Sequence, residues 1–322
     1  MINKFSVIWD CSRVFALPMT IMAWLVVFTY SATVSGQIMY GLIALIAVCF
    51  VHLAANILDD FFDYKSLIKQ VGYDKTEYLK NSQKTKCRYL VSGYIKEKDI
   101  LILACIYLVL AILIGLFFFF KCGVGVIYFA LVGGFITVFY SFMSKIRLSE
   151  VAIGVAYGPA LFGGIYYVMT KTFSWDVFIL SVPTLIVTVI LLYVHSVMDF
   201  EYDLNEGHNT VANSFDSQLD ALVVLKWLLI SAYIAPLLAC IFDILDWQVC
   251  LVLLTIPLAV DLYKSMELFA IEPESEPEHK WFHFPMENMR GAPSFMIRMY
   301  QARNLCLYYS ILLSISILLS LN

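Results

Sequence analysis

The feature that most constrains the fold is a series of nine apolar stretches of roughly twenty residues, the length of helix that spans the hydrocarbon core of a bilayer. Hydrophobic residues make up 61% of the 322-residue chain and charged residues only 14%, with a mean hydropathy of +0.82. This balance excludes an ordinary soluble domain. The stretches lie near residues 14–34, 37–58, 99–120, 123–144, 150–170, 175–198, 219–242, 246–270 and 303–321.

These stretches predict helices rather than strands. The strands of a transmembrane β-barrel alternate apolar and polar residues, whereas a run such as LILACIYLVLAILIGLFFFF does not. An open sheet cannot satisfy its backbone hydrogen bonds in lipid. We therefore predict an all-α membrane protein with nine transmembrane helices, forming a single domain over residues 1–322.

Basic residues predict the orientation of the helices. If the N-terminus is cytoplasmic, nineteen of the 21 Lys and Arg residues fall on or near the cytoplasmic side, leaving only Lys121 and Lys171 opposite. By the positive-inside rule we expect the N-terminus and the long polar connections inside and, after nine crossings, the C-terminus outside. The first stretch is followed by another span, so we do not interpret it as a cleaved signal.

Two of the stretches end in the same polar pattern, 143 residues apart. In each segment polar residues follow one another at steps of four, four and three, so they share one face of a helix. Ionisable side chains within or at the edge of a membrane helix are costly and mark a functional site. The two columns consist of His52, Asn56, Asp60 and Asp63, and of His195, Asp199, Asp203 and Glu206.

The residue types in these columns predict a magnesium site. Carboxylate and amide oxygens suit Mg²⁺, which keeps several waters and shares its shell with substrate phosphates. Two facing columns would hold two or more Mg²⁺ ions with a diphosphate between them. His52 and His195 lie one turn further into the membrane, so we interpret them as hydrogen-bond partners or packed core residues rather than ligands.

Basic and aromatic residues near helix ends fit the same chemistry. Positive charge lowers the barrier to departure of a diphosphate, and Arg88, Lys145 and Arg147 lie close to predicted helix ends. A diphosphate that leaves an allylic carbon leaves a carbocation, which aromatic faces stabilise without attacking it. Tyr140 lies at the predicted cytoplasmic end of its helix, level with the carboxylates.

Other sequence features give weaker indications. The eight cysteines include no C-x-x-C pair and are typical of free thiols or apolar packing. The connection at 271–302 contains the run EPESEPEHK, which is typical of an irregular surface loop, and arginines beyond it, such as Arg298, could reach an anion. The net charge is −4 and no basic DNA-binding module is visible, so we expect no nucleic-acid partner.

Five motifs in order resemble those of the UbiA superfamily of intramembrane prenyltransferases, and within it the branch that prenylates dihydroxynaphthoate to make menaquinone. The family's N-D-x-x-D motif is similar to residues 59–63, preceded by Asn56, and its D-x-x-x-D motif with G-K-x-T is similar to 199–203 and 207–210. The remaining similarities are R-P-x-x-S-G to 88–93, the Tyr-Ser pair to 140–141, G-E…F-G-P to 149–159, and the usual start of the first helix to Arg13 and Pro18.

The repeated polar pattern predicts a pseudo-repeat between the second and sixth helices, and the resemblance implies nine helices in a ring around a central cavity. It also implies Mg²⁺ bound by both motifs and transfer of a prenyl group from a prenyl diphosphate to an aromatic or quinone-precursor acceptor. The implied metal ligands are Asn56, Asp59, Asp60, Asp63, Asp199 and Asp203. The implied catalytic residues are Asp60, Asp63, Asp199, Asp203 and Tyr140, and the implied substrate-binding residues are Arg13, Asn56, Arg88, Ser141, Lys145 and His208.

Three departures from the family pattern leave alternatives open. Asp59 replaces an Asn and creates D-D-x-x-D, a pattern that terpene cyclases also use, including membrane-bound cyclases on this fold. His208 replaces the Lys of G-K-x-T, and Tyr89 replaces the Pro of the basic loop. The alternatives are therefore a cyclase without an acceptor and, less compatible with carboxylates at helix ends, a transporter with an acidic site near the bilayer midplane.

Overall fold

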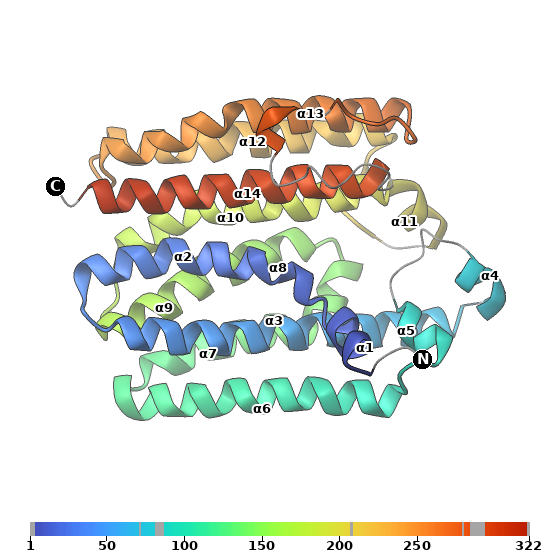
Figure 1. The fold of residues 1–322 in the computed structure, drawn as a ribbon, viewed down its shortest axis with the longest axis horizontal. Coiled ribbons are helices and arrows are strands. Elements are labelled where there is room, and N and C mark those ends of the chain that lie inside the picture. The colour runs from blue at the N-terminus through green and yellow to red at the C-terminus, as the bar shows by residue number, and fades with distance from the viewer. Residues whose placement is uncertain are drawn as a thin grey trace.

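The computed structural model of the chain describes residues 4–70, 72–80, 87–206, 209–278, 280–283 and 294–320. Every regular element within these ranges is a helix. The long helices run side by side along the molecule, with α1 near one end and the last turn of α14 at the other (Figure 1). Within the described residues, nine segments are long and apolar enough to cross a membrane, as the sequence predicts.

The nine membrane-length segments include three that combine several elements, because the first and the eighth begin as 3-10 helices and the fifth is broken by a π-helical turn. In chain order they are η1 (Val14–Ala16) with α2 (Leu17–Val34), α3 (Ile38–Leu67), α6 (Glu97–Cys122), α7 (Gly125–Lys145), α8 (Ser149–Val155) with η2 (Ala156–Ala160) and α9 (Leu161–Thr170), α10 (Trp175–Met198), α12 (Gln218–Ile241), η4 (Trp247–Thr255) with α13 (Ile256–Ile271), and the part of α14 (Ser294–Leu319) from Met296 onward.

Short helices gather at one end of the long ones, where α3 ends (Figure 1). Apolar side chains hold α4 and α5 there, because Leu67 of α3 packs with Tyr78 and Val91 in a small buried cluster. The short elements are α1 (Lys4–Cys11), η1 (Val14–Ala16), α4 (Lys75–Lys80), α5 (Arg88–Ser92), α11 (Phe200–Glu206), η3 (Ala212–Ser214) and η5 (Trp281–His283).

Local sequence signals account for several helix ends. Ser174 and Ser217 are the N-caps of α10 and α12, and their hydroxyls accept the backbone N–H groups of Asp176 and Asp220 at 3.2 and 3.1 Å. Two boundaries differ from the prediction. Helix α3 continues to Leu67 and α14 begins at Ser294, because hydropathy locates only the apolar part of a helix that extends into polar sequence.

The helices that carry the two polar columns are connected by shared neighbours. Helix α3 packs against α2, α6, α7 and α9, and α10 packs against α2, α9, α12 and α14, so α2 and α9 contact both. Small residues allow close approach: a Cβ on Gly163 of α9 would lie 2.2 Å from the Phe129 ring of α7. The ring arrangement and the pseudo-repeat remain predictions.

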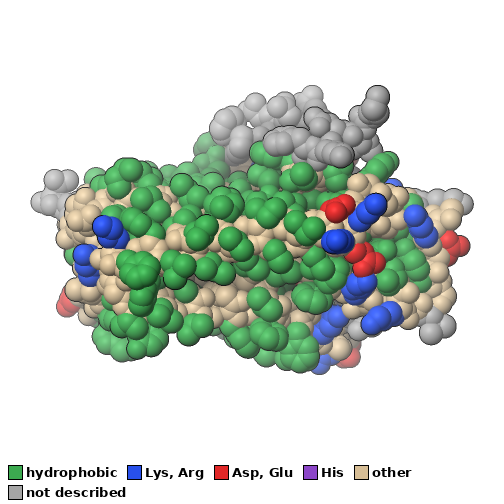
Figure 2. All heavy atoms as spheres, turned by 90° about the horizontal axis from the view of Figure 1, so that it is seen from below, with side chains coloured by type: hydrophobic (Ala, Val, Ile, Leu, Met, Phe, Trp, Pro, Cys, Tyr) green, Lys and Arg blue, Asp and Glu red, His purple; other side chains and the backbone are tan. Residues whose placement is uncertain are grey.

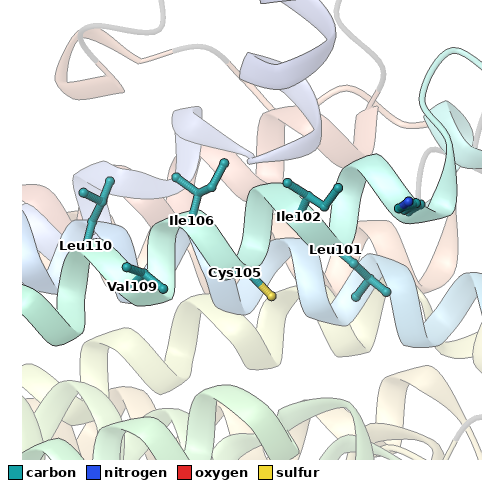
Figure 3. Close-up of a pocket in the computed structure, with 7 residues that line it drawn as sticks. Leu101, Ile102, Cys105, Ile106, Val109 and Leu110 are labelled. Carbon is teal, nitrogen blue, oxygen red and sulfur yellow. The ribbon is translucent and has the colours of Figure 1, made fainter.

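The outer surface is apolar along most of its length. In the face seen in Figure 2, hydrophobic side chains cover the middle, and Lys, Arg, Asp and Glu gather toward the ends. A shallow hollow of about 410 Å³ lies on the outer face of α6 and is lined by apolar residues such as Ile102, Ile106 and Val109 (Figure 3). This hollow is lined by none of the acidic residues of the two columns, and its composition fits contact with lipid.

Candidate active site

The first polar column lies on the last turns of α3, where the sequence places its acidic motif. The side chains of Asp59 and Asp60 are buried, with residue exposures of 5% and 6%, and Asp63 is half-buried. A buried carboxylate costs several kcal/mol unless a counter-charge or hydrogen bonds compensate it. The local structure must therefore supply positive charge and donors at this point.

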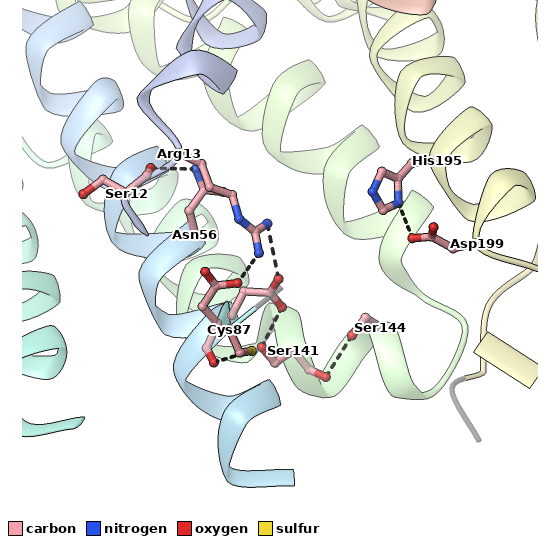
Figure 4. Close-up of polar contacts among 10 residues, drawn as sticks. Ser12, Arg13, Asn56, Cys87, Ser141, Ser144, His195 and Asp199 are labelled. Carbon is pink, nitrogen blue, oxygen red and sulfur yellow. Dashed lines mark hydrogen bonds and ion pairs between the residues drawn. The ribbon is translucent and has the colours of Figure 1, made fainter. Parts of the chain in front are cut away.

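Arg13 supplies the counter-charge. Its guanidinium forms an ion pair with Asp60, and its Nη1 lies 3.8 Å from Oδ2 of Asp59 (Figure 4). Burial alone would lower the pKa of Arg13, but the two carboxylates act in the opposite direction and raise it above its ordinary value. The turn before the first membrane span is also fixed to the column, because Nδ2 of Asn56 donates to the carbonyl of Ser12 at 3.2 Å.

Two residues that contact Asp60 have strained backbones. Arg13 has a φ of 50° and Cys87 a φ of 58°, in the left-handed region that residues other than glycine seldom adopt. The thiol of Cys87 donates to the carbonyl of Asp60 at 3.1 Å. Such conformations cost about 1–3 kcal/mol each and cluster at functional sites, where surrounding contacts hold them.

Helix α7 joins the site through its last turns. The hydroxyl of Ser141 donates to Oδ1 of Asp59 at 2.9 Å, so Asp59 is held between Arg13, just before η1, and helix α7. Tyr140, its neighbour, is half-buried. Lys145 lies one turn further on, exposed, and donates to the hydroxyl of Ser66 at 2.7 Å. The structure therefore brings Arg13, Asn56, Asp59, Asp60 and Ser141 together, with Lys145 at the edge.

The second column is not one continuous helix. Helix α10 ends at Met198, Asp199 forms the turn, and α11 follows, although the N–H of Asp203 still donates to the carbonyl of Asp199 at 2.7 Å. Oδ2 of Asp199 lies 3.1 Å from Nδ1 of His195, and these side chains are 42% and 50% exposed, whereas Asp203 is buried. Figure 4 shows this pair at the end of α10, apart from Arg13 and the residues bonded to it.

Two further predicted substrate-binding residues are Arg88 and His208. Arg88, at the start of α5, is half-buried, and one of its guanidinium nitrogens donates to the carbonyl of Leu79 at 2.7 Å, which ties it to α4. His208 lies outside the described residues. Tyr89 forms a hydrogen bond with Asp10 of the N-terminal helix α1. Burial is the main reason that the pKa of Tyr89 is raised to about 12, and this hydrogen bond is the second.

The donor set fits Mg²⁺ although no preformed cage is visible. Within the described ranges, no three His, Cys, Asp or Glu side chains are grouped closely enough to hold a metal by themselves. Mg²⁺ does not require such a cage, because it is usually bound through one or two carboxylates plus substrate phosphates and water. The oxygens of Asp59, Asp60 and Asn56 are hard ligands that suit Mg²⁺. In this structure Arg13 compensates the negative charge of the two carboxylates.

A second polar group lies one turn deeper on α3. Nδ1 of His52 is 2.5 Å from the hydroxyl of Thr20 on α2 and 2.6 Å from that of Tyr157 in η2, and the two hydroxyls are 3.2 Å apart. The interpretation of His52 as a hydrogen-bonded residue rather than a ligand is compatible with these contacts. Sequence reasoning did not find Thr20, because a lone Thr in an apolar stretch carries no signal.

A third polar cluster connects α13, α14 and the segment between them. Asp261 accepts hydrogen bonds from Nε2 of His283 at 2.5 Å and from Gln301 at 3.3 Å, and it forms an ion pair with Lys280. The hydrogen bond to Asp261 raises the pKa of Lys280. The sequence offered no partner for Asp261, since Lys280 and His283 follow a proline-rich run.

Arg298 fastens the same segment. Its fully buried guanidinium donates to the carbonyls of Ser265 and Ser275 at 3.0 and 2.9 Å and lies over the ring of Phe269. The prediction that residues 271–302 form an irregular loop is therefore wrong for its last part, because α14 already begins at Ser294. The reason is that Arg298 and its polar neighbours are buried against α13, which hydropathy alone cannot indicate.

Comparisons with known proteins agree with this architecture. Residues 16–285 match the UbiA prenyltransferase family, a range that includes both polar columns. A 2-carboxy-1,4-naphthoquinone phytyltransferase from Synechocystis sp. is 25% identical over 132 residues, which are 41% of this chain and 43% of that protein. The chain thus matches less than half the length of this curated relative.

Solved structures share the fold at low sequence identity. The apo structure of a UbiA homolog from Aeropyrum pernix K1 aligns with a TM-score of 0.63 at 14% identity, covering 94% of this chain and 99% of that one. A structure of a digeranylgeranylglyceryl phosphate synthase aligns with a TM-score of 0.56 at 18% identity, covering 98% and 96%. The apolar helices make the protein an integral multi-pass membrane protein. With a family match over most of its length, the chain belongs to the UbiA prenyltransferase family.

Proposed function

We propose that the protein is an Mg²⁺-dependent prenyltransferase that cleaves a prenyl diphosphate within the membrane and transfers the prenyl group to an aromatic or quinone-precursor acceptor. The observation that supports this most strongly is the buried pair Asp59 and Asp60, clamped by Arg13 and Ser141 at the end of a membrane helix. Ionisable residues buried at the end of a membrane helix are rare and mark a functional site by default.

The proposed roles of the polar residues are metal binding and phosphate binding. Asn56, Asp59, Asp60 and Asp63 on α3 would hold Mg²⁺, together with Asp199, the C-cap of α10, and Asp203 on α11. Bound Mg²⁺ neutralises the charge that develops on a departing diphosphate. Arg13 already lies beside the carboxylates, and Lys145 and Arg88, with His208, are the further groups proposed to bind phosphate.

The carbocation that remains must meet an acceptor before it meets water. Tyr140 would present its aromatic face to this cation, which aromatic rings stabilise electrostatically. Ser141 is adjacent to Tyr140 and hydrogen-bonded to Asp59, so it would fix the position of the acidic motif along the membrane normal relative to Tyr140. We further propose one domain, a ring of nine helices around a cavity, a cytoplasmic N-terminus and a C-terminus outside, following the distribution of Lys and Arg.

The acceptor class is favoured by the naphthoquinone relative, whose match covers less than half of each chain. The D-D-x-x-D motif keeps a cyclase as the second candidate. Purified protein should be incubated with Mg²⁺ and prenyl diphosphates of several lengths, with and without aromatic acceptors, and the products identified by mass. A prenylated acceptor supports the proposal. A cyclised hydrocarbon formed equally well without acceptor supports the cyclase, and no diphosphate release under any condition contradicts both.

A further inference from the structure

The cluster formed by His52, Thr20 and Tyr157 belongs to neither acidic motif and has no role in the proposed function so far. Three separate segments, α2, α3 and η2, contribute one side chain each, and all three polar groups lie within hydrogen-bond distance of one another. The rings of His52 and Tyr157 also meet edge to face, with centroids 6.2 Å apart. Such a closed group fixes the orientation of the imidazole.

One nitrogen of this imidazole is engaged and the other is available. Both hydroxyls approach Nδ1, and within the described part of the chain Nε2 forms no hydrogen bond. The side chain of His52 is half-buried, so part of its surface stays accessible. A histidine held through one ring nitrogen presents the other in a defined direction.

The backbone beside Tyr157 is distorted. Tyr157 lies in the π-helical turn η2, whose Gly158 has non-helical angles of φ −94° and ψ −108°, next to Pro159. Gly158 packs tightly, since a Cβ there would lie 2.7 Å from Leu185. Single π-helical turns inside helices are uncommon and frequently occur at functional sites.

The depth of His52 relates the cluster to the proposed reaction, on which this inference rests. His52 precedes Asn56 by one turn of α3, which places it about 6 Å deeper along the helix axis. If a diphosphate binds at the level of Asn56 and Asp60, the carbon attached to it lies on the membrane side of that level. A ring that attacks this carbon would therefore lie beside His52.

We propose that His52 is the residue that positions the acceptor: its Nε2 hydrogen-bonds a hydroxyl or carbonyl oxygen on an aromatic ring, while Thr20 and Tyr157 hold the imidazole in place. The ligand class is thus a hydroxylated or quinoid aromatic ring. The apolar part of such a ring suits the surrounding membrane helices, and its single polar edge needs one well-oriented partner in a site of low dielectric constant.

The test uses two amides that mimic different ring nitrogens. His52→Gln places an amide group near the position of Nε2, whereas His52→Asn reaches only the position of Nδ1. We expect His52→Asn to raise the acceptor KM about tenfold, which corresponds to the loss of one oriented hydrogen bond of about 1.4 kcal/mol. The kcat should change much less. His52→Gln should have an acceptor KM between those of His52→Asn and the wild type. Mg²⁺-dependent binding of the prenyl diphosphate should change less than twofold in both.

A matched control separates positioning from packing. Tyr157→Phe removes the hydroxyl that holds His52, and Tyr233→Phe removes an equivalent Tyr–Thr contact, with Thr255 at 2.9 Å, in another part of the protein. Only Tyr157→Phe should raise the acceptor KM. An unchanged KM in His52→Asn, or an equal loss of prenyl diphosphate binding and acceptor affinity, would overturn the inference while the wild type still prenylates an acceptor. A wild type that binds no prenyl diphosphate would instead refute the proposed function.

Discussion

Replacing Arg13 tests whether the acidic motif depends on its counter-charge. Nη1 of Arg13 lies 3.8 Å from Asp59 and the guanidinium also pairs with Asp60, so at an effective dielectric constant of about 20 the attraction to Asp59 alone is about 4 kcal/mol. Desolvation offsets much of this attraction, but breaking a buried pair still costs about 3–5 kcal/mol. We expect Arg13→Gln to lose about 3 kcal/mol of unfolding free energy in EDTA.

Magnesium should restore much of that stability, because it can supply the missing positive charge. At a concentration of about 100 times the Kd, a ligand adds about 2.7 kcal/mol. The assay is denaturant unfolding in detergent, with EDTA and with Mg²⁺, and Mg²⁺ should stabilise Arg13→Gln more than it stabilises the wild type.

A double-mutant cycle decides whether charge is the cause. Asp60→Asn needs no cation beside it, so the double variant Arg13→Gln/Asp60→Asn should be more stable in EDTA than Arg13→Gln alone. Equal instability of the single and double variants, or a loss below about 1 kcal/mol in Arg13→Gln, would refute the reasoning.

Three further predictions follow from contacts outside this pair. Asp261→Asn removes the charge that faces His283 in a buried pair and should cost about 3 kcal/mol in unfolding experiments, whereas an unchanged stability would show that the pair contributes nothing. Burial is the main reason that the pKa of the Cys11 thiol is raised to about 11, so the thiol stays protonated at about pH 8. Peptide mapping should therefore find Cys11 unmodified by iodoacetamide until the protein is unfolded. Complete alkylation of the folded protein at about pH 8 would contradict this prediction. Lys145→Met removes an exposed hydrogen bond to Ser66, so stability should change by less than about 1 kcal/mol while the affinity for prenyl diphosphate falls, and equal affinity would remove Lys145 from the phosphate site.

The sequence predicted the membrane helices well because length and hydropathy determine which segments can cross a bilayer. The acidic column on α3 was also predictable, since steps of three and four place Asn56, Asp60 and Asp63 on one helical face. Hydropathy failed at the polar ends: α3 extends to Leu67 and α14 begins at Ser294, because those turns are stabilised by tertiary contacts rather than by lipid.

Contacts between distant segments were the part that sequence could not provide. Nothing in the spacing indicated that Ser141 bonds to Asp59 or that Thr20 meets His52, since each of these partners lies in an otherwise apolar helix. The turn at Asp199 was hidden for a similar reason, because the pattern in the second column repeats the first although the backbone bends there.

The central claim is that the two acidic motifs form one magnesium and diphosphate site, and Mg²⁺-dependent release of diphosphate from a prenyl diphosphate tests it most directly. Asp60→Asn and Asp203→Asn should each lower the rate of release at least about a hundredfold, the effect of losing a strong electrostatic contact in a preorganised site. Because residues that act as one unit are not additive, the double variant should lose far less than the product of the two single losses. Fully multiplicative losses, or release that proceeds at the wild-type rate in either single variant, would contradict a shared site.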